Sequence, residues 1–196
     1  MRDPRLERWL EALVAAPGLT AVRDVEAAWR VHVEDSLTAL EAVAGFNGSV
    51  VDVGSGGGAP GIPLAANLPR RAVTLLEASE WKCAFLREVA RAFPNVSVVR
   101  GRAEEQPTDG FGVALAKALA PPPVAAEWCL PLVRAGGGVV LWVGPSADAD
   151  HVARVAEQVG GALVEASGGL LVLRKVRPTP PGFPRRPGMA RKRPLR

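Results

Sequence analysis

The stretch from Ser49 to Ala66 constrains the fold of this chain more than any other part of the sequence. Residues 50–53 are three valines and one aspartate, and such a β-branched run predicts a buried strand. Five glycines follow within residues 54–61, and they permit a sharp turn that leaves the main chain open to a ligand. An apolar helical pattern resumes at Ile62, with Pro60 near the expected first turn. The stretch therefore predicts a strand, a glycine-rich turn and a helix.

Such a unit is typical of sites for nucleotide-like cofactors, and the residues narrow the choice. The phosphate-binding motif Gly-x-x-x-x-Gly-Lys-Ser/Thr is absent, which argues against a P-loop. A serine-hydrolase turn around Ser55 would need glycine at position 53, where Val53 stands. Gly56, Gly58 and Gly61 satisfy the Gly-x-Gly-x-x-Gly dinucleotide pattern, so a nicotinamide cofactor stays open.

The next predicted strand, residues 72–76, is followed directly by Glu77. A carboxylate at this place can accept hydrogen bonds from both hydroxyls of a ribose. NAD and S-adenosylmethionine both carry that ribose. The pattern therefore favours an adenosine cofactor over a purely structural turn, without deciding between the two.

The segment from Asp52 to Ala65, Asp-Val-Gly-Ser-Gly-Gly-Gly-Ala-Pro-Gly-Ile-Pro-Leu-Ala, resembles the signature of the RsmG (GidB) family. Members of this family are bacterial methyltransferases that act on guanine N7 of 16S ribosomal RNA. The similarity continues in the family's order through Leu19–Asp24, His32–Leu37, Leu75–Glu77, Phe85–Arg87, Arg102–Glu105 and Cys129–Leu132. The resemblance implies S-adenosylmethionine as cofactor and 16S ribosomal RNA, or the small-subunit ribosomal particle, as partner.

Alternating strand and helix patterns predict an α/β fold. The resemblance implies a Rossmann-like class I S-adenosylmethionine-dependent methyltransferase, with a seven-stranded, mostly parallel sheet whose last strand is antiparallel. We expect an N-terminal helical cap over residues 1–47, a core over residues 48–175 and a basic, proline-rich C-terminal tail over residues 176–196.

Apolar spacing predicts the individual elements. Leu6, Trp9, Leu10 and Leu13 repeat at helical intervals, and a second helical region follows from about Val25. Further helices are expected over residues 80–93, 124–133 and 148–159, and further strands over 95–100, around 113–115, and over 138–143, 162–166 and 170–175. The apolar side chains of the helix 80–93, Trp81 included, are expected to pack on the sheet.

The resemblance also implies the roles of the site residues. Gly54 and the loop to Ala59, with Ser55, Gly56 and Gly58, would surround the methionine part of the cofactor, and Glu77 with Ala78 and Ser79 would bind the ribose. Ala103 and Glu104 follow a strand end, and a backbone N–H and a carboxylate there suit the edge of adenine.

Lys117 occupies the family's usual arginine position, where it would contact the cofactor and position the substrate. A lysine keeps the charge but loses the planar fork of arginine. Val143, where the family commonly has a lysine, is another departure.

His32, Asp35 and Ser36 invite comparison with a catalytic triad. Their spacing on one helix cannot make three side chains converge with a buried orienting acid. We therefore expect a capping and packing device beside the cofactor pocket, with Asp35 able to approach the ligand.

The positive charge of the chain is concentrated at its C-terminal end. Residues 174–196 carry nine Lys or Arg and no acid, so the remaining residues have a net charge of −5. Six prolines predict an extended or irregular tail without a regular helix. We expect it to contact RNA phosphates through Arg185, Arg186, Arg191, Lys192 and Arg193. The alternative is a solubilising or unstructured tail. Truncation after Lys175 should weaken RNA binding and flatten its salt dependence, and should leave cofactor affinity nearly unchanged.

Cys83 and Cys129 lie far apart and outside any Cys-x-x-Cys, so neither a zinc site nor a disulfide framework is indicated, and no metal is expected. No apolar run reaches membrane length and the N-terminus lacks a signal-peptide core. We expect a cytoplasmic monomer that does not bind membranes.

Guanine N7 carries an in-plane lone pair and no hydrogen, so its methylation releases no proton there and needs no general base. Alignment of nitrogen, methyl carbon and sulfur would carry the catalysis. Two alternatives stay open: a methyltransferase for another RNA or a small molecule, and a non-catalytic RNA-binding protein that retains the fold.

Overall fold

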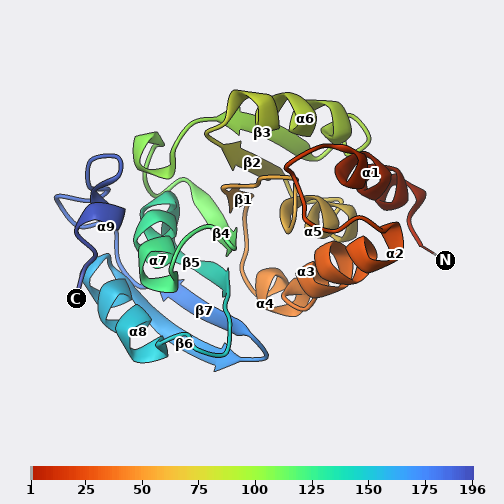
Figure 1. Cartoon of the computed structure of the whole chain (residues 1–196). Coiled ribbons are helices and arrows are strands. Elements are labelled where there is room, and N and C mark those ends of the chain that lie inside the picture. The colour runs from red at the N-terminus through yellow and green to blue at the C-terminus, as the bar shows by residue number, and fades with distance from the viewer. Residues whose placement is uncertain (1) are drawn as a thin grey trace.

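The computed structural model describes residues 2–196 and shows one seven-stranded sheet with helices on both faces (Figure 1). The strand order is β3-β2-β1-β4-β5-β7-β6. The first five strands along the chain pair in parallel, and β7 is antiparallel to both β5 and β6. The predicted seven-stranded, mostly parallel methyltransferase sheet is therefore confirmed. The strands are β1 (Val50–Val53), β2 (Val73–Glu77), β3 (Val96–Arg100), β4 (Phe111–Lys117), β5 (Val133–Trp142), β6 (Gly161–Ser167) and β7 (Leu170–Lys175).

The first strand lies in the middle of the sheet, where it is covered on both faces. All four residues of β1 are buried, including Asp52 at 1% exposure. Val51 and Val53 belong to one hydrophobic cluster and Val50 to the other, because alternate side chains of a strand point to opposite faces. Burial on both faces explains why the strand is a continuous apolar run.

Helices α5 (Gly61–Asn67) and α6 (Glu80–Ala90) cover one face together with the N-terminal cap. The cap consists of α1 (Pro4–Ala15), α2 (Val25–Ala28), α3 (Asp35–Leu37) and α4 (Leu40–Ala44), with a π-helical turn over Trp29–Glu34 between α2 and α3. The cap has no separate core, since its buried side chains and those of α5 and α6 form a single cluster. Trp9 is 2% exposed within that cluster and donates its Nε1–H to the carbonyl oxygen of Gly57 at 2.9 Å. The cap is thereby tied to the glycine-rich turn.

Helices α7 (Pro122–Cys129) and α8 (Ala149–Gln158) cover the opposite face. The helix predicted over residues 124–133 begins two residues earlier and ends at Cys129, where a 3-10 turn over Leu130–Leu132 follows. Pro131 lies in that turn, and proline cannot continue the α-helical hydrogen-bond pattern.

The expectation that Trp81 packs on the sheet is wrong, because this side chain is 51% exposed. The buried residues of α6 are Cys83, Leu86 and Ala90, at intervals of three and four. Trp81 precedes Cys83 by only two positions, so it points away from the buried stripe. The aromatic ring stands instead near the backbone of Gly18, in the loop after α1.

The C-terminal tail, residues 176–196, is folded against α7 and forms the short helix α9 (Met189–Lys192) beside it (Figure 1). The expectation of a tail without any helix is therefore wrong at this point. The six prolines all lie outside residues 188–193, so one helical turn fits between Pro187 and Pro194. Ala190 is 2% exposed and belongs to the hydrophobic cluster of this face. Within residues 2–196, no helix has the length and apolar character needed to span a membrane.

Candidate cofactor and substrate site

The glycine-rich turn after β1 depends on backbone conformations that favour glycine. Gly54, Gly56 and Gly58 have φ values of +71°, +55° and +104°, in the left-handed region that L-residues avoid. A Cβ on Gly54 would also lie 2.4 Å from Cδ1 of Leu119, which packs against the turn from the loop after β4. The turn therefore needs glycine at residue 54 both for its conformation and for its contact.

Glu77 lies at the carboxyl end of β2 and is only 8% exposed. Its Oε2 accepts a hydrogen bond from the Gly56 N–H at 3.0 Å, and its Oε1 accepts one from the Ser79 N–H at 2.8 Å. Each carboxylate oxygen has a second acceptor position. Glu77 thus holds the glycine-rich turn in place and keeps capacity to accept hydrogen bonds from a ligand.

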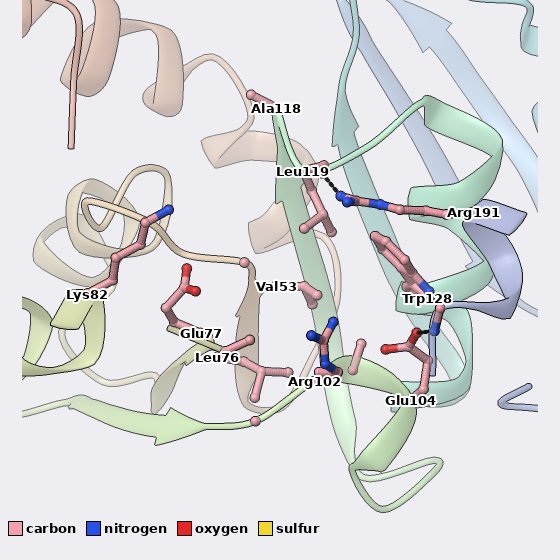
Figure 2. Close-up of a pocket in the computed structure, with 15 residues that line it drawn as sticks. Val53, Leu76, Glu77, Lys82, Arg102, Glu104, Ala118, Leu119, Trp128 and Arg191 are labelled. Atoms are coloured by element: carbon pink, nitrogen blue, oxygen red, sulfur yellow. Dashed lines mark hydrogen bonds between the residues drawn. The ribbon is translucent and has the colours of Figure 1, made fainter. Parts of the chain in front are cut away.

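Two pockets open at the carboxyl ends of the parallel strands, where ligands bind in open α/β sheets. The first has a volume of about 300 Å³, and Figure 2 shows Lys82 and Glu77 toward one end and Glu104, Trp128 and Arg191 toward the other. Its lining consists of Val53, Gly54, Leu76, Glu77, Ala78, Lys82, Gly101, Arg102, Ala103, Glu104, Ala118, Leu119, Trp128, Gly188 and Arg191.

The second pocket, of about 270 Å³, lies on the cap side of the glycine-rich turn. It is lined by Leu13, Leu19, His32, Gly54, Ser55, Gly56, Gly57, Ala59, Lys82, Lys117 and Ala118. The two pockets share Gly54, Lys82 and Ala118. Together they form a bent site with the turn at its centre.

The structure brings most of the predicted site residues into these two pockets. Gly58 and Ser79 are the exceptions and line neither. Gly58 faces the core instead, since a Cβ on this residue would lie 2.5 Å from Cδ1 of Ile62. Ser79 takes part through its backbone N–H, which binds Glu77.

Asp52 supports the turn from beneath and lines neither pocket. Its Oδ2 accepts a hydrogen bond from the N–H of Gly61, the first residue of α5, at 3.1 Å. Burial raises the pKa of Asp52 to about 7, and the negative charge of Glu77 acts in the same direction. This carboxyl group connects the strand to the helix behind the site.

Lys117, at the end of β4, lines the second pocket but is held by the cap. Its Nζ donates a hydrogen bond to the carbonyl oxygen of Val31 at 2.7 Å and forms an ion pair with Asp35. The side chain of Lys117 is 17% exposed. Asp35 itself lines neither pocket and lies beside the second one as the partner of Lys117.

His32, Asp35 and Ser36 bind different partners and do not converge. The ring Nε2 of His32 lies 3.0 Å from the Thr20 hydroxyl, whereas the Ser36 hydroxyl donates to the main-chain carbonyl of His32. Burial and the charge of Lys117 lower the pKa of His32. The three side chains therefore do not form a triad, and none of them caps α3 through a side-chain hydrogen bond.

Lys82 is a site residue that the sequence analysis missed. It lines both pockets, and within residues 2–196 its ammonium group has no hydrogen-bond or ion-pair partner. Its position in the first turn of α6, five residues after Glu77, was the available signal. Residues 2–196 contain no group of three or more His, Cys, Asp or Glu side chains arranged to hold a metal ion.

Two of the five cations predicted to bind RNA are engaged within the protein. Arg185 donates two hydrogen bonds to the carboxylate of Glu127, both at 2.6 Å. Arg191 donates to the carbonyl oxygen of Leu119 at 3.1 Å. Arg191 is nevertheless exposed, as are the other three cations, Arg186, Lys192 and Arg193.

Comparison with known proteins connects this geometry to a family. The family described as rRNA small subunit methyltransferase G (GidB) matches residues 5–161. A ribosomal RNA small subunit methyltransferase G of Moorella thermoacetica is 36% identical over 90% of this chain and 82% of its own length. The corresponding protein of Pelotomaculum thermopropionicum is 38% identical with the same coverage of both chains. The chain belongs to the rRNA small subunit methyltransferase G family.

Solved structures similar to this family member share its fold. A geranyl diphosphate methyltransferase in complex with S-adenosylmethionine has a TM-score of 0.60 at 12% identity and covers 85% of this chain and 95% of its own. The T. thermophilus 16S rRNA N2 G1207 methyltransferase RsmC has a TM-score of 0.53 at 20% identity, covering 76% of this chain and 40% of its own. These similarities confirm the class I methyltransferase fold.

S-adenosylmethionine is the cofactor of the rRNA small subunit methyltransferase G family, and the first pocket fits it. At Gly54 the main chain faces the pocket without a side chain. Glu77 presents hydrogen-bond acceptors at the end of a strand. Leu119 and Trp128 form apolar walls for a purine ring. The volume of about 300 Å³ is at the lower end of small-molecule sites, and the adjoining second pocket extends it.

Proposed function

We propose that this protein transfers the methyl group of S-adenosylmethionine to N7 of a guanine in 16S ribosomal RNA. The observation that carries the proposal is that the two pockets meet at Gly54 in a chain that belongs to the small subunit methyltransferase G family. A donor in the first pocket then meets an acceptor in the second across the glycine-rich turn. The proposal includes cytoplasmic action, where the ribosome is assembled, by a monomer.

The roles of the residues follow from their positions. The methionine part of the donor extends from the first pocket past Gly54 to Ser55, at the start of the second pocket. Glu77 binds the ribose hydroxyls, and Ala103 and Glu104 bind the adenine edge. The second pocket, between the turn and the cap, receives the guanine. The cap, the core and the C-terminal tail, residues 1–47, 48–175 and 176–196, then act as substrate cover, donor-binding core and RNA-facing edge.

The chemistry requires alignment more than proton transfer. When bound, S-adenosylmethionine would supply an electrophilic methyl group: the N7 lone pair would form the new nitrogen–carbon bond as the carbon–sulfur bond breaks, S-adenosylhomocysteine would leave, and no proton would be released. No general base is needed, because N7 has no proton to lose; His32, which lies beside the pocket, is held by Thr20, and burial lowers its pKa. The pairing of Lys117 with Asp35 offsets a positive charge beside the purine, where positive charge develops during transfer.

We assign contact with RNA phosphates to Arg186, Lys192 and Arg193, the exposed cations of the predicted set whose side chains have no partner within residues 2–196. Arg185 and Arg191 contribute through the folding of the tail, since both hold partners within the protein. Affinity for RNA should therefore fall as salt concentration rises.

The test is methyl transfer from labelled S-adenosylmethionine to deproteinised 16S RNA and to small-subunit particles, with mass-spectrometric mapping of the modified nucleoside. We expect 7-methylguanosine at one position, which is absent from 16S RNA of cells lacking the protein and restored by re-expression. Unchanged 16S RNA in those cells, together with transfer to a small molecule or to another RNA, would refute the proposal. Binding of NAD without binding of S-adenosylmethionine would refute the cofactor.

A further inference from the structure

The C-terminal tail enters the first pocket, a role that the sequence analysis did not predict. Gly188 and Arg191 line this pocket together with Glu77 and Glu104. The N–H of Gly188 donates a hydrogen bond to Oε1 of Glu104 at 3.0 Å (Figure 2). A segment expected to extend outward toward RNA instead closes the pocket at the end assigned to adenine.

Arg191 joins two walls of the pocket that come from different parts of the chain. Its guanidinium group donates to the carbonyl oxygen of Leu119 and lies 5.1 Å from the ring centre of Trp128. Leu119 belongs to the loop after β4 and packs against Gly54, whereas Trp128 belongs to α7 and is 9% exposed. One side chain of the tail therefore contacts two lining residues from different elements, the main chain of Leu119 and the ring of Trp128.

The position of the tail is built into the fold. Arg185 forms a two-bonded ion pair with Glu127, whose side chain is only 3% exposed. Such fork-to-carboxylate pairs are geometrically specific, since both N–H groups must align with both oxygens. Together with buried Ala190, this pair anchors the tail on either side of Gly188. The tail residues that make these contacts lie beyond residue 161, where the match to the family model ends.

We propose that the C-terminal tail forms a wall of the S-adenosylmethionine site, with Gly188 and Arg191 as positioning residues. The N–H of Gly188 occupies one oxygen of Glu104 and orients the carboxylate, so that its other oxygen accepts from the adenine amino group. Arg191 contacts both Leu119 and Trp128 and thereby holds these two lining residues in place. This inference rests on the proposed function, because it assigns the first pocket to that cofactor. Removal of the tail then weakens binding of the methyl donor, contrary to the expectation from sequence.

Calorimetric titration with S-adenosylhomocysteine tests the proposal without turnover. The full-length protein is compared with a chain ending at Pro187, which keeps the anchor at Arg185 and loses the pocket wall. Arg191→Ala is compared with Lys192→Ala, which removes an exposed neighbouring charge from the same helix.

We expect the truncation and Arg191→Ala to weaken binding of S-adenosylhomocysteine about tenfold, which corresponds to the loss of roughly one hydrogen bond to a charged group. Lys192→Ala should leave the affinity for S-adenosylhomocysteine unchanged. In methyl transfer, Arg191→Ala should raise KM for S-adenosylmethionine and leave kcat nearly as it was.

A truncated chain that keeps its thermal unfolding transition and binds S-adenosylhomocysteine as tightly as the parent would overturn the proposal. If the truncated chain does not fold, equal affinities of Arg191→Ala and Lys192→Ala would overturn it. Loss of affinity for 16S RNA alone would assign the tail to RNA and have the same consequence. Failure of the parent to bind S-adenosylhomocysteine is a different result, since it refutes the proposed function before any tail variant is compared.

Discussion

The ammonium group of Lys117, at the end of β4, forms an ion pair with Asp35 in the cap and donates to the neighbouring carbonyl oxygen of Val31 at 2.7 Å. Lys117 and Asp35 lie 82 positions apart in the sequence and are joined above the second pocket. Asp35 also accepts a hydrogen bond at its main-chain oxygen from Nε1 of Trp142, in β5, at 3.0 Å. These contacts connect the cap to β4 and β5 beside the proposed guanine site.

Replacing Lys117 with methionine should lower methyl transfer more than it lowers stability. The pair is partly exposed, so we expect a loss of about 1 kcal/mol in the free energy of unfolding. Transfer should fall about tenfold or more, because the cover of the second pocket is no longer held in position. Urea unfolding and single-turnover transfer measure the two effects, with Lys117→Arg as the variant that retains the charge. Parent rates in Lys117→Met would show that the pair has no part in the reaction.

Replacing Glu77 with glutamine should weaken binding of the methyl donor. The two carboxylate oxygens of Glu77 accept hydrogen bonds from the N–H groups of Gly56 and Ser79. In glutamine an NH₂ group replaces one of these oxygens, and because NH₂ is a donor it cannot accept from the backbone N–H that it faces. We expect the affinity for S-adenosylhomocysteine to fall about tenfold or more, through both the ribose contact and the turn. Glu80→Gln is the matched control, because Glu80 is an exposed carboxylate three residues away. Equal affinities in a calorimetric comparison of the two variants would contradict this role of Glu77.

Asp52 should make the folded protein less stable as the pH rises. Its pKa of about 7 lies above the ordinary value of 3.8, so between these values the folded chain retains a proton that the unfolded chain releases. Stability from this group is complete below about pH 4 and is lost as the pH rises through 7. Asp52→Asn cannot ionise and still accepts a hydrogen bond from Gly61. Urea unfolding from pH 5 to pH 8 should show a smaller loss of stability in the variant, and identical pH dependence would refute the assignment.

Breaking the pair between Arg185 and Glu127 should destabilise the fold. Arg185→Met leaves the Glu127 carboxylate buried at 3% exposure without its partner, and such a change costs about 3 kcal/mol. The double variant Arg185→Met with Glu127→Leu should recover most of that loss, because the uncompensated charge is gone. Chemical unfolding of the two single variants and the double variant provides the cycle. Additive losses would mean that the two side chains do not interact in solution.

The part of the site nearest the strand ends could be predicted from the sequence. Gly54 and Glu77 each follow an apolar strand directly, and parallel strands bring their carboxyl ends to one edge of the sheet. The apolar periodicity also indicated the strand and helix order, and β7 has the predicted bounds. The prediction that Trp81 packs on the sheet was wrong because it followed from hydrophobicity alone. The spacing of Trp81 from Cys83 does not match the buried stripe of α6.

Local pattern determined that this chain forms a parallel α/β sheet with a glycine-rich ligand turn, because each strand, turn and helix is specified by residues close together in the sequence. Only the tertiary structure decided the partners of the charged residues. Arg185 and Arg191 look like RNA-binding cations in a basic segment, but Glu127 and Trp128 lie more than 50 residues earlier in the chain and reach them only after α7 has packed on the sheet. Whether a charged side chain has a partner within the protein depends on which groups the fold brings next to it, and those groups can lie far away in the sequence.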